Sequence, residues 1–313
     1  MAQYPLQGRT LFITGGGSGI GAEVARQAAG RGARLALVDV DIDAAQRLAD
    51  SLPEAIAIQA DVRDYDSLEA AVNQTVERFG GIDAAMANAG IEIAHTSRAV
   101  PLVEMERIAD INFTGVFRTV RAVLPQLIER RGYLLITASA AAIAHTPPLS
   151  HYAATKAGVE AFGNAVRLEY RHKGVDVGVA YFGFIDTPMV QRGKSDPILA
   201  KFEERTSRGP LSKTYPVSAA AGKVIKGLES RSRRVMHPGF LRIGLTIRAA
   251  LPRIIERGLK DELLSDFIGE LDQRDLQGDT SGDHSREFHE RVLANSEADR
   301  YDSRGHDDDP VLS

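Results

Sequence analysis

The sequence contains no cysteine, which excludes disulfide bonds, thiolate metal sites and cysteine nucleophiles. It has no run of about 18 or more apolar residues, so no membrane-spanning helix is expected. The first residues lack the charged and apolar regions of a signal peptide, and we therefore expect a cytoplasmic protein. A net charge of −4 on 313 residues is too small to indicate nucleic acid as a partner.

Short apolar segments alternate with longer amphipathic segments over residues 1–190. The expected strands are 10–14, 34–39, 55–60, 82–87, 133–138 and 175–181, and the expected helices include 19–30, 65–79, 103–130 and 150–172. Most of the strands are continuous apolar runs, typical of parallel strands that are covered on both faces. The pattern predicts an α/β fold of the Rossmann type, a doubly wound parallel sheet with helices on both faces.

The alternation ends near residue 190. Residues 191–214 are polar and predict a long loop with one short helix, followed by a helix at 217–229 and a last strand at 233–236. The predicted domains are a Rossmann-type α/β domain at 1–236, a basic amphipathic helical extension at 237–271 and an acidic, disordered tail at 272–313.

A glycine-rich segment, TGGGSGIG at 14–21, follows the first expected strand and opens the first expected helix. Glycines there let the backbone turn tightly and approach a pyrophosphate at the positive end of the helix. An ordinary strand-to-helix turn is the alternative, because short motifs also occur by chance. The place of the segment in the chain favours nucleotide binding. The candidate contact residues are Gly15, Gly17, Ser18, Gly19 and Ile20.

Asp39 ends the second strand, 18 residues after Gly21. An acidic residue at about this distance accepts hydrogen bonds from the ribose hydroxyls of the cofactor, and its charge repels the extra phosphate of NADP. Neither Ser18 nor Val40 is a basic residue that would bind that phosphate. NAD(H) is therefore expected to be preferred over NADP(H), with a helix-capping or turn aspartate as the alternative role.

Two further short motifs follow the third and fourth strands. They are Asp61 with Val62, and Asn88 with Ala89 and Gly90. The carboxyl ends of parallel strands are where open α/β sheets bind ligands, so both motifs are candidates for cofactor contacts. Asp61 has the alternative role of a helix cap.

Tyr152 and Lys156 are four residues apart on an expected helix, which places both side chains on one face. An ammonium beside a phenol favours the phenolate and so makes the tyrosine a better base. A surface Tyr–Lys pair is the alternative. Ser139 ends the fifth strand, where its hydroxyl could hold a substrate oxygen beside Tyr152. Asn112 lies inside a long apolar helix, where its amide needs a partner.

These motifs, taken in order over residues 8–190, resemble the short-chain dehydrogenases/reductases. The resemblance implies that Tyr152 is the catalytic acid and base and that Ser139 orients the reacting oxygen. It implies that Lys156 bonds the nicotinamide ribose and lowers the pKa of the tyrosine, so that both Tyr152 and Lys156 also count as cofactor-binding residues. Asn112 would hold a water molecule in a proton relay.

The segment FGFIDT at 182–187 resembles the family's P-G-x-x-x-T, which implies that Thr187 contacts the nicotinamide amide, with Ile185 beside it. Phe182 replaces the usual proline, a departure that bears on the shape of the nicotinamide pocket. Ala87 replaces the first asparagine of N-N-A-G, which the family often tolerates.

Apolar residues after the sixth strand, with residues 140–144 opposite, favour a hydrophobic secondary alcohol or ketone as the substrate. The candidate substrate residues are His145, Phe182, Phe184 and Met189. We expect no metal site, because His145 and His151 have no third ligand at a suitable spacing.

The sequence thus predicts an NAD-dependent oxidoreductase with a Ser-Tyr-Lys-Asn mechanism, in which residues 1–236 form the NAD-binding catalytic domain. The alternative is a regulatory protein that binds NAD(H) on the same fold with little turnover. The resemblance also implies a homodimer or homotetramer, formed by the helices that carry Asn112 and Tyr152.

Residues 240–259 combine an excess of arginine with an apolar face. One interpretation is a helix packed on the protein's own core or across a subunit interface. The other is a peripheral contact with an anionic membrane surface over the substrate loop, with Pro252 marking a bend between two short helices.

Overall fold

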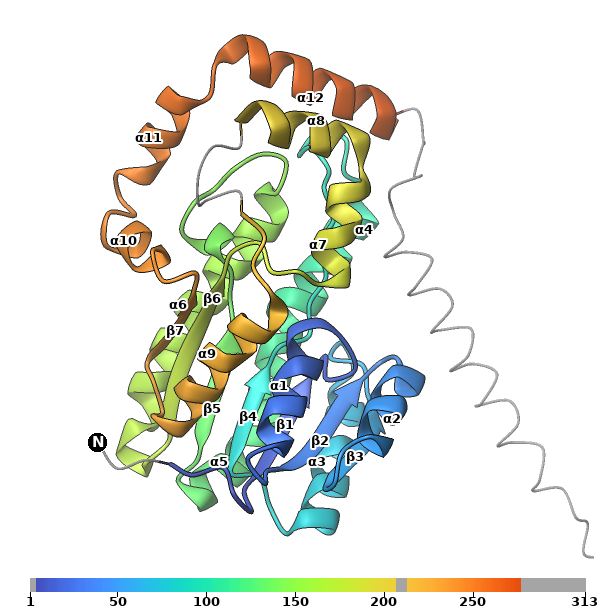
Figure 1. Ribbon diagram of the computed structural model, residues 1–313, viewed down its shortest axis with the longest axis vertical. Coiled ribbons are helices and arrows are strands. Elements are labelled where there is room, and N and C mark those ends of the chain that lie inside the picture. The colour runs from blue at the N-terminus through green and yellow to red at the C-terminus, as the bar shows by residue number, and fades with distance from the viewer. Residues whose placement is uncertain (1–3, 207–212, 277–313) are drawn as a thin grey trace, which may run out of the picture.

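A seven-stranded parallel sheet forms the centre of the computed structural model, which describes residues 4–206 and 213–276. The strands are β1 (Thr10–Thr14), β2 (Arg34–Asp39), β3 (Ala55–Gln59), β4 (Ala84–Ala87), β5 (Tyr133–Thr137), β6 (Asp176–Phe182) and β7 (Arg234–His237). Their order across the sheet is β3-β2-β1-β4-β5-β6-β7 (Figure 1). The chain reverses its winding direction between β1 and β4, as in a doubly wound fold.

Helices cover both faces of this sheet. One face packs on α1 (Gly19–Ala29), α2 (Ile42–Asp50) and α9 (Val217–Glu229), and the other packs on α3 (Tyr65–Phe79), α5 (Gly115–Arg130) and α6 (Ser150–Tyr170). Two apolar clusters result, one on each side, and the side chains of each strand alternate between them. The predicted Rossmann-type α/β fold is confirmed.

The helix predicted at 103–130 is divided into three parts. They are α4 (Leu102–Ala109), the π-helical turn η1 (Asp110–Thr114) and α5. Single π-turns inserted into α-helices occur frequently at functional sites. This turn contains Asn112, a candidate catalytic residue.

Two helices occupy the segment that was predicted as a polar loop with one short helix. They are α7 (Pro188–Ser195) and α8 (Pro197–Thr206), and the rest of that segment up to residue 212 lies outside the described residues. Pro197 and Pro188 each stand at a helix start, where a missing N–H costs nothing.

The extension consists of α10 (Leu241–Thr246), α11 (Leu251–Gly258) and α12 (Asp261–Leu276). Pro252 lies in the first turn of α11 instead of at the bend, which falls at residues 247–250. Helix α12 continues past Asp272, where the acidic tail was predicted to begin, and the remaining tail at 277–313 lies outside the described residues. In the part of the chain that is described, no helix is long and apolar enough to cross a bilayer.

Candidate active site

The glycine-rich turn joins β1 to α1. Gly15 and Gly19 have φ angles of 66° and 53°, in the left-handed region that residues with a side chain rarely adopt. A Cβ on Gly21 would lie 2.1 Å from the Gly15 carbonyl oxygen, so no side chain fits there. Ser18 is exposed at the start of α1, Ile20 is half-buried, and no side chain caps the helix. The turn therefore provides the close backbone approach and the uncapped helix start that a phosphate group requires.

Asn88 fastens this turn to the end of β4. Its side-chain amide donates to the carbonyl oxygens of Thr14 and Gly15 at 3.1 and 3.2 Å, and its backbone N–H donates to the Thr14 hydroxyl at 3.0 Å. A Cβ on Gly15 would lie 3.0 Å from the Cα of Ala89. Two motifs that are far apart in the sequence thus form one packed unit, in which the Asn88 amide shapes the turn.

Asp39 faces the same turn from the end of β2. Its Oδ2 accepts a hydrogen bond from the Gly17 N–H at 2.8 Å, and its Oδ1 accepts one from the Asp41 N–H at 3.1 Å. Burial raises the pKa of Asp39, and these backbone hydrogen bonds act in the opposite direction. Asp41 caps α2 by accepting from the Ala44 N–H at 3.0 Å, so the capping role considered for Asp39 belongs to Asp41.

Asp61 lies after β3 and is paired with a neighbouring arginine. Arg63 donates to Asp61 Oδ2 at 2.6 Å, and the Arg63 backbone N–H donates to Oδ1 at 2.9 Å. The cap of α3 is Asp64, which excludes that alternative for Asp61. Val62 beside it is buried, and a Cβ on Gly115 would lie 2.8 Å from it. A cofactor group that reaches Asp61 would therefore share its carboxylate with Arg63.

Tyr152 and Lys156 lie one turn apart on α6, and both are buried. The Lys156 Nζ lies 5.6 Å from the centre of the Tyr152 ring and donates to the Thr137 carbonyl oxygen at 3.2 Å. Ser139, after β5, is close enough to the Tyr152 hydroxyl to affect its pKa by hydrogen bonding. A Cβ on Gly90 would lie 3.3 Å from Nζ, so the end of β4 reaches the same point. The alternative of a surface Tyr–Lys pair is excluded.

Burial controls the protonation of this pair. It raises the pKa of Tyr152 above its ordinary value, the Glu92 carboxylate raises it further, and the hydrogen bond with Ser139 acts in the opposite direction. Burial also lowers the pKa of Lys156 to about 8, against the attraction of Glu92. In the protein alone, burial thus acts against the lowering of the Tyr152 pKa that was expected from Lys156, because it removes the water that stabilises a phenolate.

Asn112 holds the loop that follows Gly90. Its side chain is fully buried in η1, and its Oδ1 accepts from the Ile91 N–H while its Nδ2 donates to the Ile91 carbonyl oxygen, both at 2.8 Å. The partner that a buried amide needs is thus the backbone of Ile91. An amide retains one lone pair and one N–H beyond these two bonds, which a water molecule could use.

Glu92 is a site residue that the sequence patterns do not single out. Burial raises the pKa of Glu92 to about 7, against the opposing effect of Lys156 and Arg192. Its carboxyl is close enough to Tyr152 and Lys156 to shift the pKa of each. The one signal in the sequence is a charged residue between two isoleucines, directly after the Asn-Ala-Gly motif.

The segment after β6 contributes Thr187 to the site. Thr187 caps α7 by accepting from the Val190 N–H at 3.4 Å, and it lies over the glycine-rich turn, since a Cβ on Gly19 would lie 3.5 Å from its methyl group. The Ile185 side chain is buried in the core instead, so its backbone alone could reach a cofactor.

Phe182, a predicted substrate residue, lies in the core. Its side chain is 5% exposed and packs with the cluster on the α1 and α9 face of the sheet, whereas the preceding Tyr181 packs on the α6 face. Alternation along β6 therefore directs Phe182 away from Tyr152. Phe184 and His145 are exposed and Met189 is half-buried, and their contact with substrate stays a prediction.

His151 has a structural contact. Its Nε2 lies 2.7 Å from the Ile93 carbonyl oxygen, and burial lowers the pKa of the ring. Within residues 4–206 and 213–276, no group of three histidine, aspartate or glutamate side chains is arranged to hold a metal ion.

At the carboxyl ends of the strands, the site thus unites a glycine-rich turn, an acidic residue at the end of β2 and a Ser-Tyr-Lys-Asn set in which Asn112, Tyr152 and Lys156 are buried. A family model described as short chain dehydrogenase matches residues 9–197. The chain belongs to the short-chain dehydrogenase family. It is therefore an oxidoreductase of the type that acts on C–OH and C=O groups, and its family binds NAD(P).

Individual relatives agree with this assignment. The chain is 32% identical over 224 residues to 3beta-hydroxysteroid dehydrogenase 1 of Eggerthella lenta, an alignment that covers 69% of this chain and 86% of the relative. It resembles the crystal structure of levodione reductase with a TM-score of 0.69 and 32% identity, covering 75% and 98% of the two chains. It also resembles 3-ketoacyl-(acyl-carrier-protein) reductase from Brucella melitensis complexed with NADH, with a TM-score of 0.67, 25% identity and coverage of 74% and 97%.

Proposed function

We propose that this short-chain dehydrogenase transfers a hydride between NAD(H) and a hydrophobic secondary alcohol or ketone. The observation that carries the proposal is the buried pair of Tyr152 and Lys156 with Ser139 at the tyrosine hydroxyl. A buried ammonium and phenol at the carboxyl ends of parallel strands have no evident structural purpose, because each loses hydration there.

The cofactor fits the residues of the glycine-rich turn. The spaces that Cβ atoms would fill at Gly15 and Gly17 are bounded by Ala89 and by the Asp39 carboxylate. Gly15, Gly17, Gly19 and Asp39 would hold the adenosine half, and Gly90, Lys156 and Thr187 the nicotinamide half. When bound, NAD(H) accepts or supplies the hydride.

Tyr152 exchanges the proton that accompanies the hydride. Because its pKa is raised, the phenol is protonated at neutral pH and is ready to donate to a ketone oxygen held by Ser139. In the reverse direction the phenolate accepts the proton of the alcohol. Alcohol oxidation should therefore accelerate as the pH rises above neutrality.

The carboxylate of Asp39 supports a preference for NAD(H). A phosphate on the adenosine ribose would lie near this carboxylate, and two like charges in a partly desolvated site repel by more than about 1.4 kcal/mol, which is tenfold in affinity. The hydrogen bond from Gly17 fixes the carboxylate in this position.

The experiment that tests the function is a screen of secondary alcohols and ketones, read by NADH absorbance. The panel includes butane-2,3-diol, 3β-hydroxysteroids and 3-ketosteroids. Turnover of an apolar member that disappears in Tyr152→Phe supports the proposal. Tight NADH binding with no turnover across the panel supports the alternative, a regulatory NAD(H)-binding protein.

A homodimer or homotetramer is part of the proposal. Large apolar side chains are exposed on the outer faces of α4 and α6, where Leu102 is 74%, Val103 64% and Leu168 67% exposed. Exposed apolar surface of this kind favours association. Sedimentation velocity gives the oligomeric state, and a monomer at micromolar concentration would contradict it.

Peripheral membrane contact is a second proposal, carried by α10 and α11. Ile243 and Ile254 are 65% and 53% exposed beside the exposed Arg242 and Arg253, and α11 has no buried residue. Arg248, by contrast, is bonded to Glu160 of α6 at 2.7 Å and so anchors the segment to the protein. An apolar surface bordered by arginines is suited to anionic lipid.

Liposome co-sedimentation of the full-length protein tests this contact. Binding should require anionic lipid, weaken with salt and be lost when Arg242 and Arg253 become serine, with Arg248 left in place. A protein that stays in the supernatant at low salt leaves α10 and α11 with a packing role only.

A further inference from the structure

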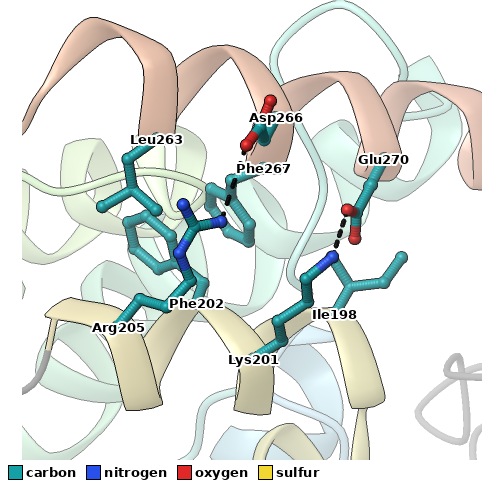
Figure 2. A pocket seen from close by; sticks show the side chains of 8 residues that line it. All are labelled: Ile198, Lys201, Phe202, Arg205, Leu263, Asp266, Phe267 and Glu270. Carbon is teal, nitrogen blue, oxygen red and sulfur yellow. Dashed lines mark hydrogen bonds and ion pairs between the residues drawn. The ribbon is translucent and has the colours of Figure 1, made fainter.

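Helix α12 lies outside the residues that match the family, yet it is packed firmly on the catalytic domain. Phe267 stacks on Phe202 of α8 with ring centres 3.8 Å apart, and Leu271 is fully buried. Figure 2 shows this contact, which is flanked by ion pairs of Lys201 with Glu270 and of Arg205 with Asp266.

The last turn of α12 contacts the loop at residues 91–98, which follows β4. Asp272 accepts a hydrogen bond from the Thr96 hydroxyl and pairs with Arg98 at 3.2 Å. Asp275 Oδ2 lies 2.9 Å from His95 Nδ1. We refer to three charged side chains of α12, Asp272, Asp275 and Arg274, as the α12 brace.

Arg274 connects the loop to α7. Its guanidinium pairs with Asp196 at the end of α7, donates to the Ala94 carbonyl oxygen at 3.4 Å and bonds Asp275. The side chains of Arg274, Asp196 and Asp275 are 15%, 9% and 0% exposed, so these contacts are shielded from water. Burial alone would raise the pKa of Asp275, but its interactions with His95 and Arg274 hold it below its ordinary value.

The other side of the same loop faces the catalytic residues. Asn112 bonds the Ile91 backbone, His151 contacts the Ile93 carbonyl oxygen, and the Ile93 side chain packs in one cluster with Tyr152. The loop is thus fixed by α6 and η1 on its inner side and by α12 on its outer side. Helices α7, α8 and α12 lie together above the carboxyl ends of the strands (Figure 1).

We infer that Arg274 and Asp275 are positioning residues that fix the 91–98 loop and α7 as two opposite walls of the substrate site. Their role rests on the proposed function, since the walls matter only if a substrate binds beside Tyr152. Loosening both walls weakens the fit of a bulky apolar substrate, whereas the glycine-rich turn is held separately by hydrogen bonds of Asn88 and Asp39.

The test compares the full-length wild type with Arg274→Gln, Asp275→Asn and the matched control Arg253→Gln, an exposed arginine of α11. The probe is a 3-ketosteroid with NADH. Both brace variants should raise KM by at least about tenfold while kcat changes by less than about threefold and the Kd of NADH stays constant. The control should match the wild type. An unchanged KM, or an equal loss of NADH affinity, would overturn the inference.

A double-mutant cycle isolates the link between the walls. If Arg274 acts by holding α7, then Asp196→Asn combined with Arg274→Gln should raise KM no further than Arg274→Gln alone. Additive effects on KM would mean that the two residues act separately, which contradicts the inference.

Hydrogen exchange separates this inference from the proposed function, because it needs no substrate. The amides of residues 91–99 should exchange at least about tenfold faster in Asp275→Asn and Arg274→Gln than in the wild type and the control. If the enzyme does not turn over the steroid but hydrogen exchange is faster in the variants, the structural role of the α12 brace is supported and the proposed substrate class is rejected. Unchanged exchange refutes the brace.

Discussion

The half-buried carboxyl of Glu92 should make the stability of the protein depend on pH in a specific way. Its pKa is raised to about 7 in the folded protein from an ordinary value of 4.5. A carboxyl whose pKa is raised by folding lowers the free energy of unfolding wherever it is ionised in the unfolded chain and neutral in the folded one. This loss of stability grows as the pH rises from about 4.5 to 7 and is complete above that range.

The magnitude follows from the shift of the pKa from 4.5 to about 7. Each pKa unit corresponds to about 1.4 kcal/mol, so the full cost at pH 8 is about 3.4 kcal/mol, of which about 0.8 kcal/mol has developed at pH 5. Partial exposure of Glu92 reduces this value. Glu92→Gln should therefore gain about 1 to 2.5 kcal/mol of stability, relative to the wild type, between pH 5 and pH 8.

Urea unfolding at both pH values measures this gain. Circular dichroism is the suitable signal, because the sequence has no tryptophan. The control is Glu54→Gln, at an exposed position between α2 and β3, which should follow the wild type at each pH. If the free energy of unfolding of Glu92→Gln changes between pH 5 and pH 8 by the same amount as that of the wild type, the burial of this carboxyl beside Tyr152 is refuted.

Three further predictions concern the cofactor site. NAD(H) should bind at least about tenfold more tightly than NADP(H), and Asp39→Ala with Val40→Arg should narrow or invert that ratio in direct titrations. Gly21→Ala should lose NADH binding in isothermal titration calorimetry, because the new Cβ would lie 2.1 Å from the Gly15 carbonyl oxygen. The control Gly193→Ala, whose Cβ would have no atom within 4 Å, should bind NADH normally. Lys156→Ala should raise the Kd of NADH and also lower kcat, and a change in only one of them would contradict its double role.

The sheet and the motifs on it were predictable because their signals are local. Continuous apolar runs at 10–14 and 34–39 match β1 and β2 to the residue, and the spacing of Tyr152 and Lys156 specifies one helix face. The motifs meet in space because parallel strands end at a common edge.

The features that were missed depend on contacts between distant residues. The prediction of a lowered pKa for Tyr152 took its neighbour Lys156 into account but not the burial of the tyrosine, which the sequence does not specify. Phe182 was interpreted from composition alone, although alternation along β6 decides which face it occupies. The contacts of α12 involve Phe202 and residues 94–98, far away in the chain, so its pattern gave no indication of them.

The central claim is that Tyr152 supplies the proton for hydride transfer with NAD(H). Stopped-flow reduction of the best ketone of the panel by wild type and Tyr152→Phe, with NADH titrations of both, tests it most directly. The account predicts that the variant binds NADH within about twofold of the wild type and reacts about 10² to 10⁴ times more slowly. A variant that keeps more than about a tenth of the wild-type rate would contradict it.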